Sequence, residues 1–179
     1  MRTAFKCRAY PTPEQAANLS RTFGCVRKVW NETLAWRHAR YYRDGLSTNV
    51  PEANAHLTAM KRTEEFAYLS EVSSVPLQQV LRTQQKAFAN FFAKRARYPR
   101  FKSRDGRQSA EYTRSAFRWR DGRLFLAKQD GPLDLAWSWP DIDPATLDPS
   151  TVTVSRDPDG RWYVSLQVDV ADPQQAPQT

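Results

Sequence analysis

The residues with the strongest chemical character in this sequence are the cations of an acid-free stretch from Val72 to Arg104. In its densest part, 94–104, six of eleven residues are Lys or Arg, and Tyr98 and Phe101 lie between them. Clustered cations repel one another, and binding to polyphosphate relieves this repulsion while it releases counterions. The aromatic rings could stack on bases. The stretch predicts nucleic-acid binding; the alternative, a solvated run of charges, usually mixes both signs, and this stretch does not.

Cations of this kind are expected to contact phosphates, which sets affinity without reading sequence. Base readout needs amides and small polar groups beside a groove. Ser74, Gln78 and Arg82 meet this need on the first turns of an expected helix, although Ser74 could equally be a simple helix cap. Arg114, Arg118 and Arg120 flank Trp119 in a second patch. The cations expected to bind RNA or phosphate are Arg8, Arg27, Lys28, Arg95, Arg97, Arg100, Lys102, Arg104, Arg114 and Arg118.

Histidine and cysteine offer little for catalysis or metal binding. His38 and His56 are the only histidines, and neither has a metal-ligating residue at a suitable spacing. Cys7 and Cys25 are far apart and form no CxxC pair, so neither a disulfide framework nor a zinc knuckle is indicated. The sequence thus favours a reducing compartment.

The carboxylates also fail to form a catalytic set. Asp141, Asp143 and Asp148 have the spacing of turn residues, without the glycine and terminal glutamate of a calcium loop. A two-metal nuclease needs several carboxylates from separate elements, and Asp169 is the one candidate on a strand. We therefore expect no catalytic residue and no metal ligand in this chain.

Charge is divided unevenly along the 179 residues. Residues 1–104 hold nineteen Lys and Arg against seven Asp and Glu, whereas residues 105–179 hold eight against twelve. Residues 1–104 are therefore expected to bind the nucleic acid. No apolar run approaches the length of a membrane span, and the first residues show no signal peptide, so we expect a cytoplasmic protein with no membrane partner.

Periodicity predicts one strand followed by helices. Residues 3–10 alternate as a short strand, and Thr12, Pro13 and Gln15 then form a helix start with a capping box. Apolar residues at helical spacing extend this helix to Asp44 and Gly45.

Two further helices are expected. The first runs from Pro51 to about residue 65, and the second starts near residues 73–76 and ends before Tyr98 and Pro99. Phe88, Phe91 and Phe92 on this last helix are interpreted as core residues, with a stacking platform as the alternative.

From residue 110 the period changes to two. Residues 112–119 and 123–128 should form a hairpin around the Asp121–Gly122 turn, and residues 151–156 and 161–170 a second one. Residues 133–137 form a possible strand, and 172–179 resemble a linker. The predicted fold is α+β: a small antiparallel β-barrel of residues 1–10 and 100–171, with a three-helix module, residues 11–99, inserted after its first strand.

Six sequence blocks together form a recognisable series. They are FKCRAYPTPEQ at 5–15, GCVRKVWN at 24–31, LSEV at 69–72, LQQVL at 77–81, AFANFF at 87–92 and YPRFK at 98–102. In this order they resemble the N-terminal portion of TnpB, the OrfB-type protein of insertion sequences and ancestor of type V CRISPR effectors. The resemblance covers residues 4–104 well, and residues 105–170 agree only in pattern.

The resemblance implies part of an RNA-guided DNA endonuclease, in which a wedge β-barrel and a helical recognition module hold the guide RNA scaffold. Such a protein reads a short motif beside the target on duplex DNA, while the guide pairs with the target. By family position, the motif-reading turn would be Ser74, Val75 and Gln78, joined by Thr48 and by the region of residues 113–116, in which we choose Ser115. Arg82 is added from its place on the expected helix. Relatives often have Lys near Ser74, so the resemblance does not imply a phosphate contact there.

The same resemblance implies a RuvC-like nuclease domain with magnesium and a zinc ribbon after the last strand. No cofactor is expected in the residues at hand, and a nuclease domain is a further possible partner. The sequence is then either a portion of a longer protein or a remnant that binds without cleaving. An autonomous basic DNA- or RNA-binding regulator is the alternative function. Tyr98, Phe101 and Trp119 are expected to pack at the seam of barrel and helices or to stack on bases.

Overall fold

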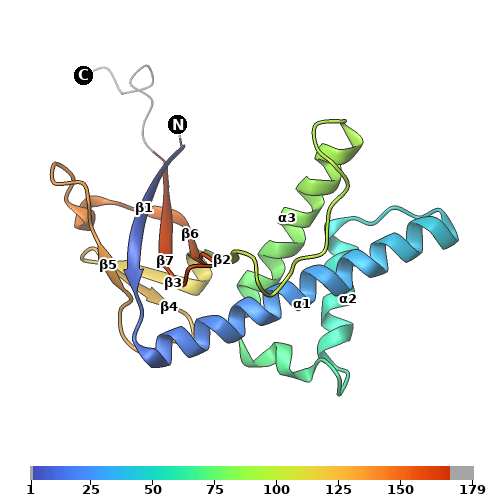
Figure 1. Cartoon of the computed structure of the whole chain (residues 1–179), viewed down its shortest axis with the longest axis horizontal. Coiled ribbons are helices and arrows are strands. Elements are labelled where there is room, and N and C mark those ends of the chain that lie inside the picture. Colours follow the sequence, from blue (N-terminus) through green and yellow to red (C-terminus); the bar gives the residue numbers. More distant parts are fainter. Residues whose placement is uncertain (1, 170–179) are drawn as a thin grey trace.

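The computed structural model describes residues 2–169, which form a sheet region and a helical region joined by one long helix (Figure 1). Strand β1 leads directly into this helix, α1, and two further helices follow before the chain returns to the sheet region. The elements are β1 Arg2–Tyr10, α1 Pro13–Asp44, α2 Val50–Lys61, α3 Ser74–Phe92, β2 Gln108–Thr113, β3 Phe117–Arg120, β4 Arg123–Leu126, β5 Asp134–Ala136, β6 Pro149–Arg156 and β7 Trp162–Asp169.

Local capping explains where the helices begin. Thr12 and Gln15 form the predicted capping box at the start of α1, and Gly45, with a φ of 67°, ends the helix in the left-handed conformation. Helix α2 begins with a second capping box, Asn49 and Glu52, and ends at Lys61, earlier than the sequence suggested. The three predicted helices are confirmed.

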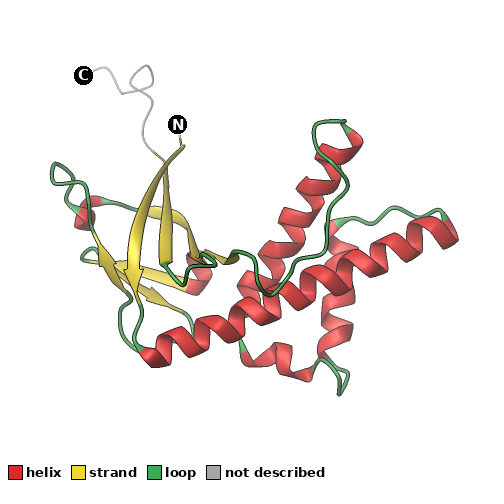
Figure 2. Cartoon of the chain, in the orientation of Figure 1, coloured by secondary structure: helices red, strands yellow, loops and turns green. Residues whose placement is uncertain are grey.

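The strands form a five-stranded antiparallel sheet in the order β2-β6-β7-β1-β5, and β3 and β4 form a separate hairpin (Figure 2). Strand β1 pairs along its length with β7, with Phe5 opposite Leu166 and Cys7 opposite Val164. The prediction that the leading strand joins the later ones in one sheet is therefore confirmed. Residues 170–179, which include the predicted linker, lie outside the described residues.

The closed barrel expected from the sequence is not found among residues 2–169. The sheet ends at β2 on one side and at the three-residue strand β5 on the other, and these two edges do not pair. The β3–β4 hairpin approaches the β5 side through one bridge, Leu124 to Leu133. The architecture is therefore a mixture of helices and open antiparallel sheets, because closure needs continuous pairing around the ring.

For the first hairpin, the predicted turn is confirmed, but the prediction of its first strand is wrong. Asp121 and Gly122 both have positive φ, 53° and 75°, as a tight two-residue hairpin turn requires. The expected strand 112–119 is interrupted by a 3₁₀ turn, Arg114–Ala116, so β2 pairs with β6 while β3 pairs with β4. The second hairpin, β6 and β7, is confirmed.

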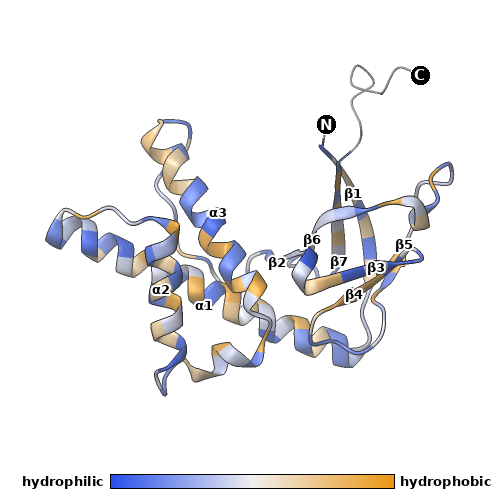
Figure 3. Ribbon diagram, turned by 180° about the vertical axis from the view of Figure 1, so that it is seen from behind, coloured by the Kyte–Doolittle hydropathy of each residue, from blue (hydrophilic) through white to orange (hydrophobic). Residues whose placement is uncertain are grey.

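Buried side chains from the sheet and from all three helices form one continuous core. Helix α1 supplies Leu19 and Phe23 to the sheet side, where Phe23 stacks on Trp162 at 5.6 Å, and Val29 and Trp30 nearer the other helices. Figure 3 shows hydrophilic colouring along the C-terminal turns of α1, beyond this core. Phe92 was expected in the core but is 62% exposed. It lies at the end of α3, which extends beyond the residues that pack against this helix.

Candidate nucleic-acid interface

The acid-free segment, residues 93–104, leaves the end of α3, runs back along that helix and crosses α1, and residues 105–107 then lead into β2 (Figure 1). Arg95, Arg97, Arg100 and Arg104 are exposed on it. Among residues 2–169, no carboxylate lies within 4.0 Å of any cation between Lys94 and Arg104. These guanidinium groups are therefore available to an external anion.

Two polar side chains and an indole hold this segment against the helices and sheet. The Trp30 indole Nε1 donates to the Arg100 carbonyl at 2.8 Å. Asn31 accepts from the Lys102 backbone N–H at 2.8 Å and donates to its carbonyl at 3.0 Å. Nε2 of buried Gln108 lies within 3.3 Å of the carbonyl oxygens of Ser103, Arg104 and Gly106. The backbone of the segment is thus fixed, while its guanidinium groups stay in solvent.

Replacing Asn31 with alanine should loosen this segment without removing a cation. Two hydrogen bonds to Lys102 are lost, and we expect the free energy of unfolding to fall by about 1–3 kcal/mol. RNA affinity should fall modestly with an unchanged salt dependence, because the number of phosphate contacts is preserved. Hydrogen exchange of residues 99–103 and binding titrations measure both effects. Asn18→Ala, on the same helix, is the control; equal exchange in both variants would contradict the role of Asn31.

Three of the expected phosphate-binding cations are partly engaged within the protein. The Lys102 ammonium lies 4.3 Å from the centre of the Trp30 ring, and burial lowers its pKa. Lys28 forms an ion pair with Glu32 at 3.0 Å. Arg27 donates to the Gln108 side-chain oxygen at 2.8 Å. The free cations of the segment are therefore better placed for phosphate than these three.

The N-terminal half of α3 presents three of the predicted motif-reading residues on one face. Ser74, Gln78 and Arg82, four residues apart, are all exposed, and α3 contains no Asp or Glu. The N-cap is Ser73, whose hydroxyl accepts from the Val75 backbone N–H, so the alternative of Ser74 as a helix cap is wrong. Val75 is half-buried and packs on the core.

The end of β4 and the residues after it lie near the start of α3, whereas Thr48 lies near the end of that helix. The Ala127 N–H donates to the carbonyl of Ala116, and Lys128 next to it donates to the carbonyls of Ser70 and Val72 at 3.3 Å. Ala127 and Lys128 also line a pocket with Val72 and Ser73 at the start of α3. Ser115 lies next to Ala116, in the 3₁₀ turn that Ala127 contacts. Thr48 instead accepts a hydrogen bond from Arg40 beside the last turns of α3. A helix of this length separates its two ends by about 28 Å.

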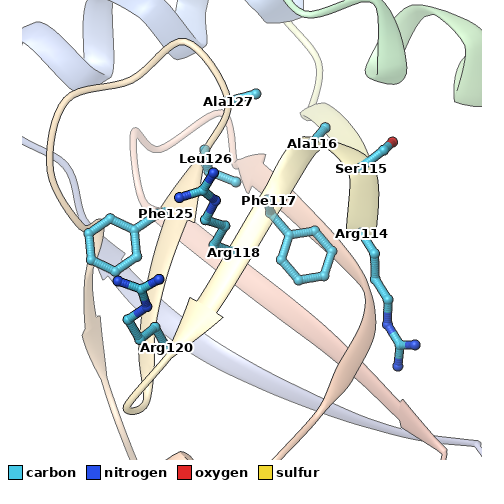
Figure 4. Close-up of a pocket in the computed structure, with 9 residues that line it drawn as sticks. All are labelled: Arg114, Ser115, Ala116, Phe117, Arg118, Arg120, Phe125, Leu126 and Ala127. Atoms are coloured by element: carbon cyan, nitrogen blue, oxygen red, sulfur yellow. The ribbon is translucent and has the colours of Figure 1, made fainter.

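A second cationic surface lies on the β3–β4 hairpin. Arg118 and Arg120 from β3 project to the same side as Phe125 from β4, around a pocket of about 480 Å³ (Figure 4). Arg114, from the adjacent 3₁₀ turn, lines the same pocket but pairs with Asp148 at 3.2 Å. Arg8 lies on β1, with its guanidinium 5.5 Å from the Tyr10 ring, apart from this surface.

The three aromatic residues expected at the seam behave differently. Tyr98 packs edge-on against Phe88 and Phe91, with ring centres 5.5 and 5.2 Å apart, and burial raises its pKa. Trp119 is half-buried and donates to the Pro144 carbonyl at 3.0 Å. Both side chains therefore pack within the protein. For Phe101 the packing expectation is wrong, because its side chain is 64% exposed.

Nowhere in residues 2–169 do three His, Cys, Asp or Glu side chains come together as a metal site. Burial raises the pKa of the Cys7 thiol to about 11, so the thiol is a poor nucleophile. Asp169 lies beside Arg2 at the exposed end of the sheet, 3.6 Å away. None of the helices in this range has the length and apolar character that crossing a bilayer demands.

Comparison with known proteins points to insertion-sequence proteins. A family model described as a helix-turn-helix domain, of the OrfB type from IS605, matches residues 1–45. In the structure this segment contains β1 and the unbroken helix α1, with no turn between two helices. The name of the family model therefore does not describe the geometry, and no recognition helix is assigned from it.

Three relatives extend this similarity. A Streptomyces pristinaespiralis protein named "Putative RNA-guided DNA endonuclease" is 60% identical over 93% of this chain. InsQ of Escherichia coli K12, with the same description, is 30% identical over 93% of the chain. The chain spans about two fifths of the length of each, 41% and 40%. The virulence protein VsdF of Salmonella dublin is 34% identical over 60% of this chain and 98% of its own length.

Proposed function

Since this chain belongs to the TnpB family of OrfB-type insertion-sequence proteins, we propose that it is a nucleic-acid-recognition lobe of an RNA-guided DNA endonuclease. In this proposal it binds the scaffold of a guide RNA and a short motif beside the target on duplex DNA. Residues 2–169 recognise nucleic acid and take no part in cleavage. Magnesium and zinc are assigned to the nuclease domain and zinc ribbon of the family, and to no residue described here.

The observation that carries this proposal is the set of unpaired cations on a fixed backbone. Arg95, Arg97, Arg100 and Arg104 are exposed, have no carboxylate partner among the described residues, and lie on a segment that Trp30 holds in place. A rigid row of guanidinium groups suits a structured RNA backbone, because little side-chain and loop order must be gained on binding. We assign the guide RNA to this surface.

The exposed face of α3 supports the assignment of duplex DNA. Gln78 and Arg82 carry the groups that hydrogen-bond adenine and guanine edges in a major groove, and Ser74 lies about one turn before Gln78. We include Ser115 in this surface, because its 3₁₀ turn is hydrogen-bonded through Ala116 to Ala127, which lines a pocket with Ser73 at the start of α3. The absence of acidic residues from α3 lets it approach phosphate without repulsion. Thr48 lies too far along the helices to read the same base pairs, so we leave it out of the motif-reading set.

A second candidate function is an autonomous DNA- or RNA-binding regulator. VsdF favours it, since almost the whole of that short protein aligns with part of this chain. On this hypothesis the same surfaces bind nucleic acid without a guide and without a nuclease partner.

Two selections on the purified chain test these proposals. From a pool of structured RNAs we expect a preferred fold, bound in a salt-dependent way. From random duplex DNA, offered together with that RNA, we expect a short motif. Motif-specific duplex binding without RNA would establish the autonomous regulator instead, and cleavage of duplex DNA by this chain alone with magnesium would overturn the recognition role.

Substitution of Gln78 gives a sharper measurement on the duplex. Gln78→Ala should reduce the preference at one or two base pairs by about 1–3 kcal/mol each. Arg82→Ala should do the same if it reads a base, or weaken all sequences equally if it contacts phosphate. Thr83→Ala is the matched control, because Thr83 is exposed on a neighbouring face of α3. A motif unchanged by both Gln78→Ala and Arg82→Ala would remove α3 from the readout surface.

A further inference from the structure

A pocket of about 530 Å³ lies where the ends of the three helices meet the acid-free segment. The C-terminal turns of α1, the loop after it, the start of α2 and the last turns of α3 form its walls, and Tyr98 closes one side. The proposed function makes no use of it. Its aromatic and apolar lining consists of Tyr41, Tyr42, Leu46, Phe88, Phe91, Phe92 and Tyr98.

Large apolar side chains are unusually exposed around this pocket. Tyr41, Tyr42, Leu46 and Phe92 are 49%, 69%, 49% and 62% exposed, and they come from two helices and a loop. Their exposure costs free energy unless a ligand or partner covers them, so a patch of this kind commonly marks a binding surface. Rings at varied angles around a cavity of this volume suit a flat apolar ligand.

One wall of the pocket holds a buried cation with unused donors. Arg37 is 5% exposed, and its Nη1 donates to the side-chain oxygen of Gln85 at 2.9 Å. Its Nε and Nη2 have no hydrogen-bond partner among the described residues. Its guanidinium carbon lies 5.1 Å from the Phe88 ring centre, and burial lowers its pKa. A buried guanidinium with unused donors is costly, and such a cost is commonly retained for function.

The only carboxylate lining the pocket does not neutralise this cation. Glu52 forms its ion pair with Arg40 at 2.8 Å, and Arg40 also donates to Thr48. The lining of the pocket thus contains one guanidinium group, that of Arg37, and one carboxylate, which is already paired with Arg40. Tyr98 then connects the pocket directly to the unpaired Arg97 and Arg100. A flat ligand with apolar faces would fit the aromatic lining, and hydrogen-bond acceptors at its edge would fit the Arg37 guanidinium.

We propose that this pocket takes one unpaired nucleotide of a single-stranded segment of RNA. The base inserts between the aromatic side chains, and its acceptor edge or its phosphate approaches Arg37, while the cations of 95–100 bind the phosphates on either side. The inference rests on the proposed function, since it presumes an RNA ligand. An apolar protein segment fits the chemistry less well, because it would leave the Arg37 donors unused.

The test is binding of a ten-nucleotide single-stranded RNA that carries the fluorescent base 2-aminopurine at one central position. Stacking on an aromatic ring quenches the fluorescence of this base, so we expect its fluorescence to fall on binding. Tyr42→Ala combined with Phe92→Ala should abolish it and weaken binding by roughly 5- to 150-fold, with the salt slope unchanged because no phosphate contact is removed. Tyr10→Ala is the control, because Tyr10 is 51% exposed but lies on β1. The deoxy version of the oligonucleotide shows whether the pocket requires RNA.

Arg37→Met provides an independent measurement that does not depend on the aromatic residues. Methionine fills similar space without a buried charge, so we expect the thermal midpoint to be kept or raised while oligonucleotide affinity falls about tenfold. A lowered midpoint with unchanged affinity would make Arg37 structural and overturn the proposal. If the aromatic double variant bound RNA as tightly as the native chain, with the same salt dependence, only the pocket proposal would be overturned. If the native chain bound no RNA, the proposed function would be overturned as well.

Discussion

Exchanging Arg95, Arg97 and Arg100 together for alanine is expected to weaken RNA binding by roughly 10- to 100-fold near physiological salt. Each of these guanidinium groups is exposed and free of carboxylates within the described residues. The slope of log affinity against log salt concentration should become less steep by about 2. Each phosphate contact on a single strand contributes about 0.7 to this slope, and three contacts are removed. Titrations by fluorescence anisotropy at four or more salt concentrations measure both quantities.

The matched control for this variant removes three arginines that are each already paired with a carboxylate. Arg2, Arg107 and Arg161 are exposed, and each lies 3.6 Å from a carboxylate. Their triple alanine variant has the same net charge as the test variant, so the overall field of the protein changes equally. We expect its salt slope to stay near that of the native chain. Equal losses in the two variants would show that net charge, and no specific segment, sets RNA affinity.

The helices could be predicted because their signals are local. Thr12, Pro13 and Gln15 are neighbours in sequence, and their capping geometry needs nothing from the rest of the chain. The same is true of the Asp121–Gly122 turn, where two consecutive residues take positive φ. The leading strand could be joined to the later ones because an isolated strand must find partners, and β1 pairs with both β7 and β5.

Whether the strands close into a barrel could not be predicted in this way, because closure depends on how far each strand pairs. The alternating pattern of 112–119 is the same for one long strand and for two strands broken at Ser115. The break follows from tertiary contacts: Arg114 donates to the Pro149 carbonyl, which lies 35 residues away. Local periodicity carries no information on such a contact.

The candidate interface was found from composition, but the residues that hold it were missed. The density of cations in 94–104 is visible in sequence, whereas Asn31 and Gln108 are single polar residues with no distinguishing pattern. Asn31 binds Lys102 across 71 positions of sequence. The one available signal was membership of Trp30 and Asn31 in a block that resembles the TnpB family. Exposure of Phe92 was missed because a helical apolar stripe does not reveal where packing partners end.

Helix α1 is the element on which both proposed binding surfaces depend. At about 1.5 Å per residue, its 32 residues extend for about 48 Å. Near its start, Ser20 accepts from Arg156 of the sheet at 3.2 Å, and near its middle, Trp30 holds the acid-free segment. Beyond that, Arg37 lines the aromatic pocket. One rigid helix therefore sets the distance between the sheet, the cationic segment and the pocket.

Trp30→Ala should be the most damaging single substitution for this arrangement. The side chain is 6% exposed, its indole N–H holds the Arg100 carbonyl, and its ring lies under the Lys102 ammonium. We expect the free energy of unfolding to fall by about 3–5 kcal/mol, because a large cavity forms in the core beside a freed segment. Urea unfolding followed by circular dichroism measures the change.

Trp30→Phe separates packing from the hydrogen bond. The smaller ring keeps most of the apolar contact but removes the donor, which leaves the Arg100 carbonyl without that partner, so a loss of about 1–3 kcal/mol is expected. Trp36→Phe is the control, because Trp36 is half-buried on the same helix and stacks on His56. If Trp30→Phe lowered stability no more than Trp36→Phe and left RNA affinity unchanged, the indole would act only through packing. The order of the cationic segment would then depend on Asn31 and Gln108 alone.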